Sequence, residues 1–406
     1  MEEPPYDLVI LGATGFTGKY VVREALKFLN ISPLKSLALA GRNLTKLNES
    51  LKWAAHPLPP PPIPLLLADV TDPHSIRRLC SYTKLILNCV GPFRRYGKAV
   101  VEACVETGCD YLDICGEPEF MERMEAEYDK MAVEKGSLVV SGCGVQNVES
   151  KNGIVCNFGS FESAVLGVAN AGELRQFRRS RPPRRSPLIV GRSTPKGPLL
   201  EYKKQFGVWS VRIPSADSSV IRRTLFTLAE NPQGLLGSNE TLDDIEQRKK
   251  FWSSVKPARF GVKIGMKSFL GILRFIVFGI FIGMLAKKAF GRWLLLTFPS
   301  IFSLGLLNKK SPSEDEVNNV SFKMWFVGHG FDDNGNDKEI VTRIMGPEPG
   351  YITTSIILIQ CAFILLTKRQ VLPKGGVLTP GIVFGPTHLQ QKLQDNGISF
   401  DVISNN

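Results

Sequence analysis

Seven residues near the start of the chain have the types and spacing of a phosphate-binding turn: Gly12, Ala13, Thr14, Gly15, Phe16, Thr17 and Gly18. They follow the apolar run Leu8–Leu11 directly and open a segment with helical spacing. In such a turn Gly12 permits the sharp bend, Gly15 lets the backbone approach a pyrophosphate, and Gly18 allows close packing of helix and strand. The first amides of the helix then face the phosphates. The motif predicts a dinucleotide site in preference to a tight turn without a ligand.

The residue after the second apolar run distinguishes between the two nicotinamide dinucleotides. This run ends at Gly41, and Arg42 follows at the point where an NAD site usually has an acidic residue for the ribose 2′-hydroxyl. An arginine pairs instead with the 2′-phosphate of NADP. We therefore expect NADP rather than NAD, against the alternative that Arg42 is an ordinary surface residue.

Four further residues stand at the ends of later apolar runs. Asp69 ends the third run, where it would hydrogen-bond near the adenine, and Asn88, Gly91 and Pro92 end or follow the fourth. Ligands of open α/β sheets bind at the carboxyl ends of the strands. These four residues are therefore predicted to line the same cofactor site.

No pair of residues identifies a catalytic acid and base. Tyr96, Cys115 and Glu117 lie near strand ends on the cofactor side, but ordinary loop or core roles account for each of them. The four histidines are scattered without the spacing of metal ligands, so no metal site is predicted. The eight cysteines form no Cys-x-x-Cys pair, which indicates reduced, buried thiols in an intracellular protein.

The elements that must position these residues alternate in type from Tyr6 to Gly144. Strands are predicted at Leu8–Leu11, Leu34–Ala40, Ile63–Ala68, Leu85–Val90, Tyr111–Ile114 and Ser137–Gly142, and helices at Gly18–Leu29, Pro92–Gly108 and Pro118–Lys135. This alternation predicts an α/β fold, a Rossmann-type doubly wound parallel sheet with helices on both faces. Residues 1–144 are assigned to this domain, and the proline-rich run Pro57–Pro64 is predicted to be a loop.

Residues 145–406 follow a different pattern and are assigned to a second, α+β domain for substrate binding or dimerisation. Asn318–Gly328 and Lys338–Met345 are strand-like, with the turn Phe331–Asp337 between them. The segment Arg175–Arg192 is rich in arginine and proline and is predicted to be a solvated loop, with contact to anionic lipid as the alternative. Its arginine cluster comprises Arg175, Arg178, Arg179, Arg181, Arg184 and Arg185.

Residues 268–308 contain two apolar runs, Phe275–Ala286 and Trp293–Leu307, with Arg274, Lys287-Lys288 and Lys309-Lys310 around them. Each run is shorter than the roughly 20 residues that span a bilayer. Aromatic and basic residues are typical of the headgroup boundary, so a membrane-associating helical hairpin is predicted. The alternative is an apolar core or dimer-interface helix. Ile352–Leu366 is diluted by polar residues and is predicted to be a core helix.

The net charge of +12 and the pI of about 9.3 suit an anionic partner, whether a phosphorylated cofactor, a membrane surface or nucleic acid. No nucleic-acid-binding motif accompanies the charge, so nucleic acid is not expected. A strand is predicted to begin at Tyr6, just after Glu2 and Glu3. We therefore expect neither a mitochondrial presequence nor a signal peptide.

Several motifs taken together identify a family. They are Val9–Gly18, Ala40–Arg42, Asn88–Phe93 with Tyr96-Gly97, and Tyr111–Glu117. The chain resembles the saccharopine dehydrogenase-like oxidoreductases, most closely their plant members, over nearly its whole length. The resemblance implies a Rossmann NAD(P) domain, a second α+β domain and a nominal oxidoreductase activity on CH–NH donors. It also implies association with lipid droplets, and the wider relatives include reductases of lipid intermediates.

The chain departs from this family after Gly144. Members usually continue from the strand ending Ser141–Gly144 with Gly-Phe-Asp-Ser-Ile-Pro, a helix and a strand. Here Val145–Ser150 follow, and the match resumes near Asn157. We therefore predict an internal deletion of some tens of residues, as in an exon-skipped or mispredicted product. In related enzymes this segment lines the boundary between cofactor and substrate domains, so a damaged substrate pocket is expected.

Two functional hypotheses follow. The first is an NADP-dependent oxidoreductase at a lipid droplet or membrane surface, acting on a small-molecule or lipid substrate in lipid or glycolipid metabolism, with a homodimer as a further option. The second is a noncatalytic lipid-droplet protein that retains the nucleotide-binding fold as a scaffold or sensor. A mitochondrial location would require import without a recognisable presequence.

Overall fold

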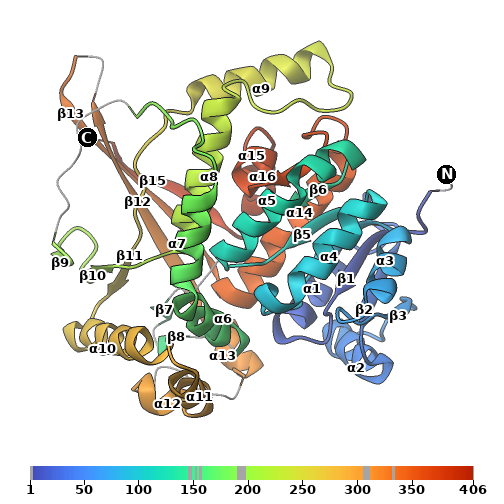
Figure 1. Cartoon of the computed structure of the whole chain (residues 1–406), viewed down its shortest axis with the longest axis horizontal. Helices are drawn as coiled ribbons and strands as arrows, with labels where there is room; N and C mark the ends of the chain where they lie inside the picture. Colours follow the sequence, from blue (N-terminus) through green and yellow to red (C-terminus); the bar gives the residue numbers. More distant parts are fainter. Residues whose placement is uncertain are drawn as a thin grey trace.

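The structure is a computed structural model that describes residues 3–144, 149–150, 153–154, 158–189, 198–304, 311–331 and 334–405. It has an α/β part with a parallel sheet and a second part with antiparallel sheets and helices (Figure 1). The predicted deletion site after Gly144 and the residues Lys309-Lys310 lie largely or wholly outside the described residues.

Among the described residues, seven strands form one parallel sheet in the order β14-β6-β5-β4-β1-β2-β3. The order reverses direction between β1 and β4, which is the switch point of a doubly wound sheet. The strands are β1 (Tyr6–Leu11), β2 (Leu37–Gly41), β3 (Leu65–Leu67), β4 (Thr83–Asn88), β5 (Asp110–Asp113), β6 (Leu138–Val140) and β14 (Gly376–Leu378). The predicted Rossmann sheet is therefore confirmed, and so are its six predicted strands.

The predicted domain boundary at Gly144 needs correction, because the sheet is not complete there. Its seventh strand, β14, comes from the C-terminal part of the chain and pairs in parallel with β6. The strand has three residues, so its sequence carries too little periodicity to separate it from a buried turn. Residues 1–144 and the C-terminal segment therefore build one sheet together.

Helices cover both faces of this sheet. They are α1 (Phe16–Leu26), α2 (Leu44–Ala55), α3 (Pro73–Ser81), α4 (Phe93–Thr107) and α5 (Pro118–Lys135). α1, α4 and α5 were predicted, whereas α2 and α3 were not. Their starts do carry capping signals, since the Asn43 and Asp72 side chains accept hydrogen bonds from the amides of Lys46 and His74. The run Pro57–Pro64 has no regular structure, as predicted.

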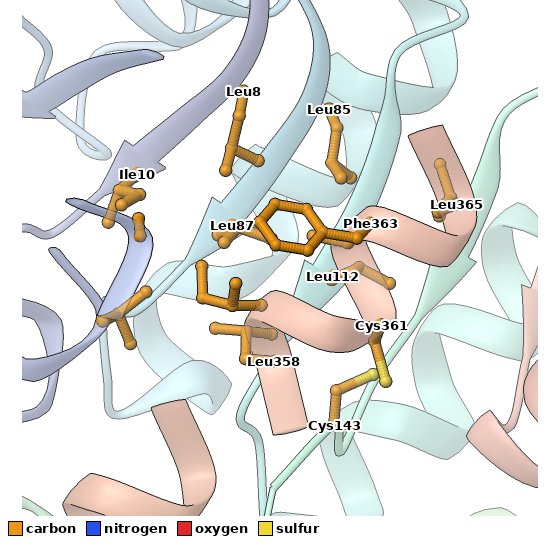
Figure 2. Packing of buried hydrophobic residues seen from close by; sticks show 14 of the residues in the cluster. Leu8, Ile10, Leu85, Leu87, Leu112, Cys143, Leu358, Cys361, Phe363 and Leu365 are labelled. Atoms are coloured by element: carbon orange, nitrogen blue, oxygen red, sulfur yellow. The ribbon is translucent and has the colours of Figure 1, made fainter. Parts of the chain in front are cut away.

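One apolar layer is completed by the long helix α14 (Thr354–Lys368), which follows the π-helical turn η1 (Pro349–Thr353). Figure 2 shows Leu358 and Phe363 of α14 packed among Leu85, Leu87 and Leu112 of the sheet. Residues 349–368 are long and apolar enough to cross a membrane, but 72% of their most apolar window is buried in the protein. The prediction of a core helix for Ile352–Leu366 is confirmed.

Within the described residues, the second part contains three antiparallel sheets. The predicted hairpin is confirmed as β12 (Ser321–Phe331) and β13 (Asp337–Pro347), which pair along their whole length. The other strands are β7 (Glu149–Ser150), β8 (Gly153–Ile154), β9 (Leu200–Lys203), β10 (Val208–Arg212), β11 (Lys263–Met266) and β15 (Ser399–Asn405). The helices of this part, apart from those at the apolar segment, are α6 (Phe158–Ala169), α7 (Ala171–Ser180), α8 (Ala216–Glu230), α9 (Leu242–Ser254), α13 (Glu314–Asn318), α15 (Pro380–Phe384) and α16 (Leu389–Asp395).

The predicted apolar hairpin is helical, and its helices are α10 (Phe269–Leu285), α11 (Ala289–Thr297) and α12 (Pro299–Phe302). They lie together at one end of the molecule, away from α2 and α3 (Figure 1). α10 begins six residues before the predicted run, because Ser268 caps it by accepting a hydrogen bond from the Gly271 amide. Residues 305–308, the end of the predicted segment, lie outside the described residues.

The arginine-rich segment is a solvated loop only in part: residues 181–189 have no regular structure, and Arg175, Arg179 and Arg185 are exposed, as predicted. Its first residues belong to α7, and Arg178 forms a two-pronged ion pair with the buried Glu122 of α5 at 2.6 and 2.8 Å. Arg184 binds Glu125 of α5 at 2.6 Å. Burying a carboxylate requires such a partner, so these arginines join the second part to the Rossmann sheet.

Candidate dinucleotide-binding site

The glycine-rich turn has the geometry that the motif predicted. Gly12 has φ of +82°, and a Cβ there would lie 2.7 Å from Cγ2 of Val90. A Cβ on Gly18 would overlap the carbonyl oxygen of Gly12. Both positions therefore require glycine, the first for its backbone conformation and the second for close approach.

The turn presents the start of α1 without a side-chain cap. Gly15 is the N-cap residue, and no side chain of the described residues accepts a hydrogen bond from the first-turn amides. These amides and the helix dipole remain available to a phosphate. The turn is held from behind, since the Ser50 hydroxyl donates to the Ala13 carbonyl at 2.7 Å. Thr14 and Gly15 are exposed, while Phe16 and Thr17 are half-buried.

Arg42 and Asp69 follow the neighbouring strands β2 and β3, so the structure brings them to the same edge of the sheet. The Arg42 side chain is exposed. Hydrogen bonds from the Thr71 amide and hydroxyl, at 2.9 and 2.8 Å, lower the pKa of Asp69, and the charge of Arg42 contributes. Asp69 thus supports its own turn, and its predicted contact near the adenine stays a prediction.

Asn88, Gly91 and Pro92 form the crossing from β4 to α4. Gly91 is exposed and Pro92 is buried as the N-cap residue of α4. The Asn88 side chain is fully buried: its amide nitrogen donates to the Tyr111 hydroxyl at 3.1 Å and its oxygen accepts from the Val90 amide at 3.0 Å. This geometry places Asn88 behind the loop, and a direct contact of its side chain with a cofactor is not supported.

The three side chains considered for catalysis have structural roles. Glu117 accepts hydrogen bonds from the Phe93 and Arg94 amides, each at 2.9 Å, and so caps α4. Burial raises the pKa of Cys115, which makes its thiol a poor nucleophile. Tyr96 packs against the apolar layer between the sheet and α3–α5.

A buried carboxyl group that the sequence analysis did not single out lies at the end of β5. Asp113 is 0% exposed, and burial raises its pKa to about 6 against hydrogen bonds that lower it. An aspartate at the end of the four-residue strand Asp110–Asp113 was the available signal, because buried carboxyls need several donors.

Comparison with known proteins assigns the cofactor. Residues 8–140 match the family model described as the saccharopine dehydrogenase NADP binding domain. Three features of the site suit NADP(H): the uncapped start of α1, the turn that requires glycine at Gly12 and Gly18, and the exposed Arg42. The Rossmann domain thus binds NADP(H), and the predicted preference for NADP is confirmed.

Comparison over the full length assigns the family. The chain is 57% identical over 442 aligned positions to an Arabidopsis thaliana protein named probable mitochondrial saccharopine dehydrogenase-like oxidoreductase, covering 99% of this chain and 97% of the relative. The chain belongs to the saccharopine dehydrogenase-like oxidoreductases. Within this family it is 30% identical to a Caenorhabditis elegans protein named lipid droplet localized protein, covering 98% of each chain.

Among solved structures, apo saccharopine dehydrogenase (L-Glu forming) from Saccharomyces cerevisiae shares the fold. It has a TM-score of 0.52 at 13% identity and covers 98% of this chain and 100% of its own. At this identity the similarity concerns the fold alone, and it includes the second part as well as the Rossmann sheet.

The alignment with the Arabidopsis relative also measures missing residues. It has 442 positions, whereas this chain has 406 residues, so at least 36 positions of the alignment have no counterpart here. Since the alignment covers 99% of the chain, these gaps are internal. Their size agrees with the predicted loss of some tens of residues, while their location after Gly144 stays a prediction.

Proposed function

We propose that this protein is an NADP-dependent oxidoreductase that works at the surface of a lipid droplet or membrane, on a lipid or small CH–NH substrate. The observation that carries the surface location is the exposed apolar face of α10–α12. The comparisons give the cofactor and the family but leave the substrate open.

The face of α10 that points outward is apolar. Leu270, Leu273, Ile280 and Met284 are 69%, 43%, 53% and 60% exposed, and their spacing places them on one side of the helix. The neighbouring α11 and α12 add Phe290, Trp293, Phe298 and Ile301, which are 42–69% exposed. Exposed apolar side chains gathered in this way mark a surface that meets lipid or another protein.

The charge of this segment favours a lipid surface over another protein. From Lys263 to Leu304, both included, the sequence has six basic residues and no acidic one. Lys287 and Lys288, in the turn between α10 and α11, are both exposed beside the apolar side chains. Basic residues bordering an apolar face are typical of helices that lie in the headgroup region of anionic membranes.

The packing of α10 favours an interfacial position over a spanning one. Its other face is held by protein, since Phe278 stacks on Phe161 of α6 at 6.0 Å and the fully buried Ile272 packs with Val211 of β10 and Met266 of β11. A helix of 17 residues is also only about 26 Å long. One face of α10 therefore suits lipid while the other anchors the helix to the fold.

The names of relatives point to two locations. One relative is named for lipid droplets and another as probable mitochondrial. We propose the droplet surface, because its single layer of headgroups over an apolar interior suits an interfacial hairpin.

Flotation with artificial droplets tests the location. We expect the wild type to float with droplets or vesicles that contain anionic lipid, and Phe290→Ser with Trp293→Ser to remain several-fold more in the soluble fraction. A matched control replaces two exposed leucines elsewhere, Leu188→Ser with Leu242→Ser, which are 84% and 85% exposed. A wild type that stays soluble and sediments as a dimer would show that the face binds a second copy instead.

A noncatalytic droplet protein is the second candidate, and the missing alignment positions favour it. NADPH oxidation with imino-acid and lipid substrates separates the two. Turnover supports the oxidoreductase, whereas tight NADPH binding without turnover on any of them supports the scaffold.

A further inference from the structure

A chain of buried polar side chains runs from the end of β6 to the cofactor turn. Its members are Ser141, Asp113, Tyr111 and Asn88, which are at most 1% exposed. Buried polar groups inside an apolar sheet are costly unless each one is hydrogen-bonded. Each of these four side chains is hydrogen-bonded, and the sequence of donors and acceptors shows which part of the structure they hold in place.

Asp113 is the centre of the chain and accepts four hydrogen bonds. One carboxylate oxygen accepts from the Tyr111 hydroxyl at 2.7 Å and from the Ser141 hydroxyl at 2.9 Å. The other accepts from the Cys115 and Gly142 amides, each at 2.9 Å. The carboxylate thereby ties together the ends of β5 and β6.

The chain continues toward β4 through Tyr111. The Tyr111 hydroxyl donates its proton to Asp113, so toward Asn88 it can only accept, and it takes a hydrogen bond from the Asn88 amide nitrogen at 3.1 Å. This fixes the orientation of the Asn88 amide, so that its oxygen faces the Val90 amide at 3.0 Å. The hydrogen bonds therefore all have the same direction: Val90 donates to Asn88, Asn88 to Tyr111, and Tyr111 to Asp113.

Val90 is the residue that touches the glycine-rich turn. A Cβ on Gly12 would lie 2.7 Å from Cγ2 of Val90 and 3.1 Å from its nitrogen. The position of Val90 thus limits the position of Gly12, on the carboxyl edge of the sheet where the cofactor binds.

We propose that Tyr111 and Asn88 are positioning residues for NADP(H), which hold the Val90 loop against the Gly12 turn and so set the shape of the pyrophosphate cradle. Neither side chain touches the cofactor. The hydrogen bond from Asn88 to Tyr111 fixes the Asn88 amide, and the Asn88 oxygen in turn holds the Val90 amide. Loss of the hydrogen bond between Asn88 and Tyr111 lets the Val90 loop shift while the sheet stays folded.

Two variants test this role. Each removes one hydroxyl group that donates a hydrogen bond to the same carboxylate oxygen of Asp113. Tyr111→Phe breaks the link to Asn88, whereas Ser141→Ala removes an equivalent donor to Asp113 that has no route to the loop. We expect Tyr111→Phe to raise the Kd of NADPH about tenfold, as for one lost buried hydrogen bond, and Ser141→Ala to change it less than about twofold. Both should lower the melting temperature, because each leaves Asp113 with one donor fewer, and Tyr111→Phe should lower it more, because it also leaves the Asn88 amide nitrogen without an acceptor.

The comparison of NADPH with NADH separates this role from the one predicted for Arg42. Tyr111→Phe should weaken NADPH and NADH by the same factor, since both contain the pyrophosphate. Asn88→Ala breaks the link from the other end while all four donors to Asp113 remain, and it should reproduce the effect even if Tyr111→Phe does not fold. The proposal is overturned if either folded variant binds NADPH as well as Ser141→Ala does.

Discussion

Arg42 is the residue that we predict to decide the choice between the two dinucleotides. It is exposed directly after β2, at the same edge of the sheet as the glycine-rich turn, and no acidic residue takes its place. Its guanidinium is suited to a phosphate because it offers paired donors and a permanent charge.

We expect Arg42→Ala to weaken NADPH binding by about tenfold or more, the worth of a charge-assisted hydrogen bond, and to leave NADH binding within about twofold. Fluorescence titration of both reduced cofactors measures this. Lys46→Ala removes an exposed charge four residues further along the chain, in the first turn of α2, and serves as the charge control. Equal losses for both cofactors would assign Arg42 to the pyrophosphate or to general electrostatics.

Asp113 should leave a signature in the pH dependence of stability. Burial raises its pKa from 3.8 to about 6, so the native state holds a proton that the unfolded chain has released. Native stability therefore falls as the pH rises from about 4 to about 6, by an amount on the order of 3 kcal/mol.

Asp113→Asn removes this titration. The free energy of unfolding of the variant, relative to wild type, should improve between about pH 4 and about pH 7, whatever the constant cost of the lost hydrogen bonds. Urea unfolding at both pH values checks the sign. A pH-independent difference would mean that the carboxyl titrates alike in the folded and unfolded chain.

At the scale of elements, β14 is a strand of the Rossmann sheet and α14 packs on that sheet, although both are far from its other strands in the sequence. Leu358 of α14 is 0% exposed in the apolar layer shown in Figure 2. Leu358→Ala should lower the free energy of unfolding by about 2–5 kcal/mol. Leu242→Ala, at a leucine that is 85% exposed on α9, should change it by less than about 0.5 kcal/mol.

Urea unfolding followed by two signals, NADPH binding and helix content, decides whether α14 is part of the cofactor domain. NADPH binding and helix content should be lost together in Leu358→Ala. Loss of helix content at lower urea than loss of NADPH binding would mean that α14 folds as a separate unit.

Elements with a long, regular pattern could be predicted from the sequence, and those fixed by distant partners could not. The motif at Gly12–Gly18 and the strands of residues 6–140 follow from local pattern and turn chemistry. β14 has three residues and depends on pairing with β6, and α7 is fixed by ion pairs to α5 that no local pattern reveals.

The site divides in the same way. The need for glycine at Gly12 and Gly18 could be predicted because it depends on the backbone of the turn itself, whereas the contact of Arg42 with the cofactor stays a prediction. Asn88 could not be placed correctly, because only the fold shows that Tyr111 takes up its amide. The role of Glu117 as a cap of α4 could not be predicted either, because only the fold places its carboxylate beside the Phe93 amide.

At the scale of the whole molecule, the missing positions set the limit on function. If the chain derives from a skipped exon or a mispredicted gene, transcript sequencing should recover a longer form that encodes at least 36 additional residues relative to this one. These should lie between Gly144 and Asn157. The longer form should turn over a substrate that the shorter form binds poorly. Transcripts that all encode the shorter chain would contradict this origin.

The parallel pairing of β14 with β6 has a consequence for synthesis of the protein. About 235 residues separate the two strands, and translation at about 5–20 residues per second needs roughly 10–50 seconds to cover them. During that time β6 emerges as an open edge, with backbone groups ready to pair with any other strand. The edge of β6 therefore stays open in newly made chains until the last thirty or so residues are being made.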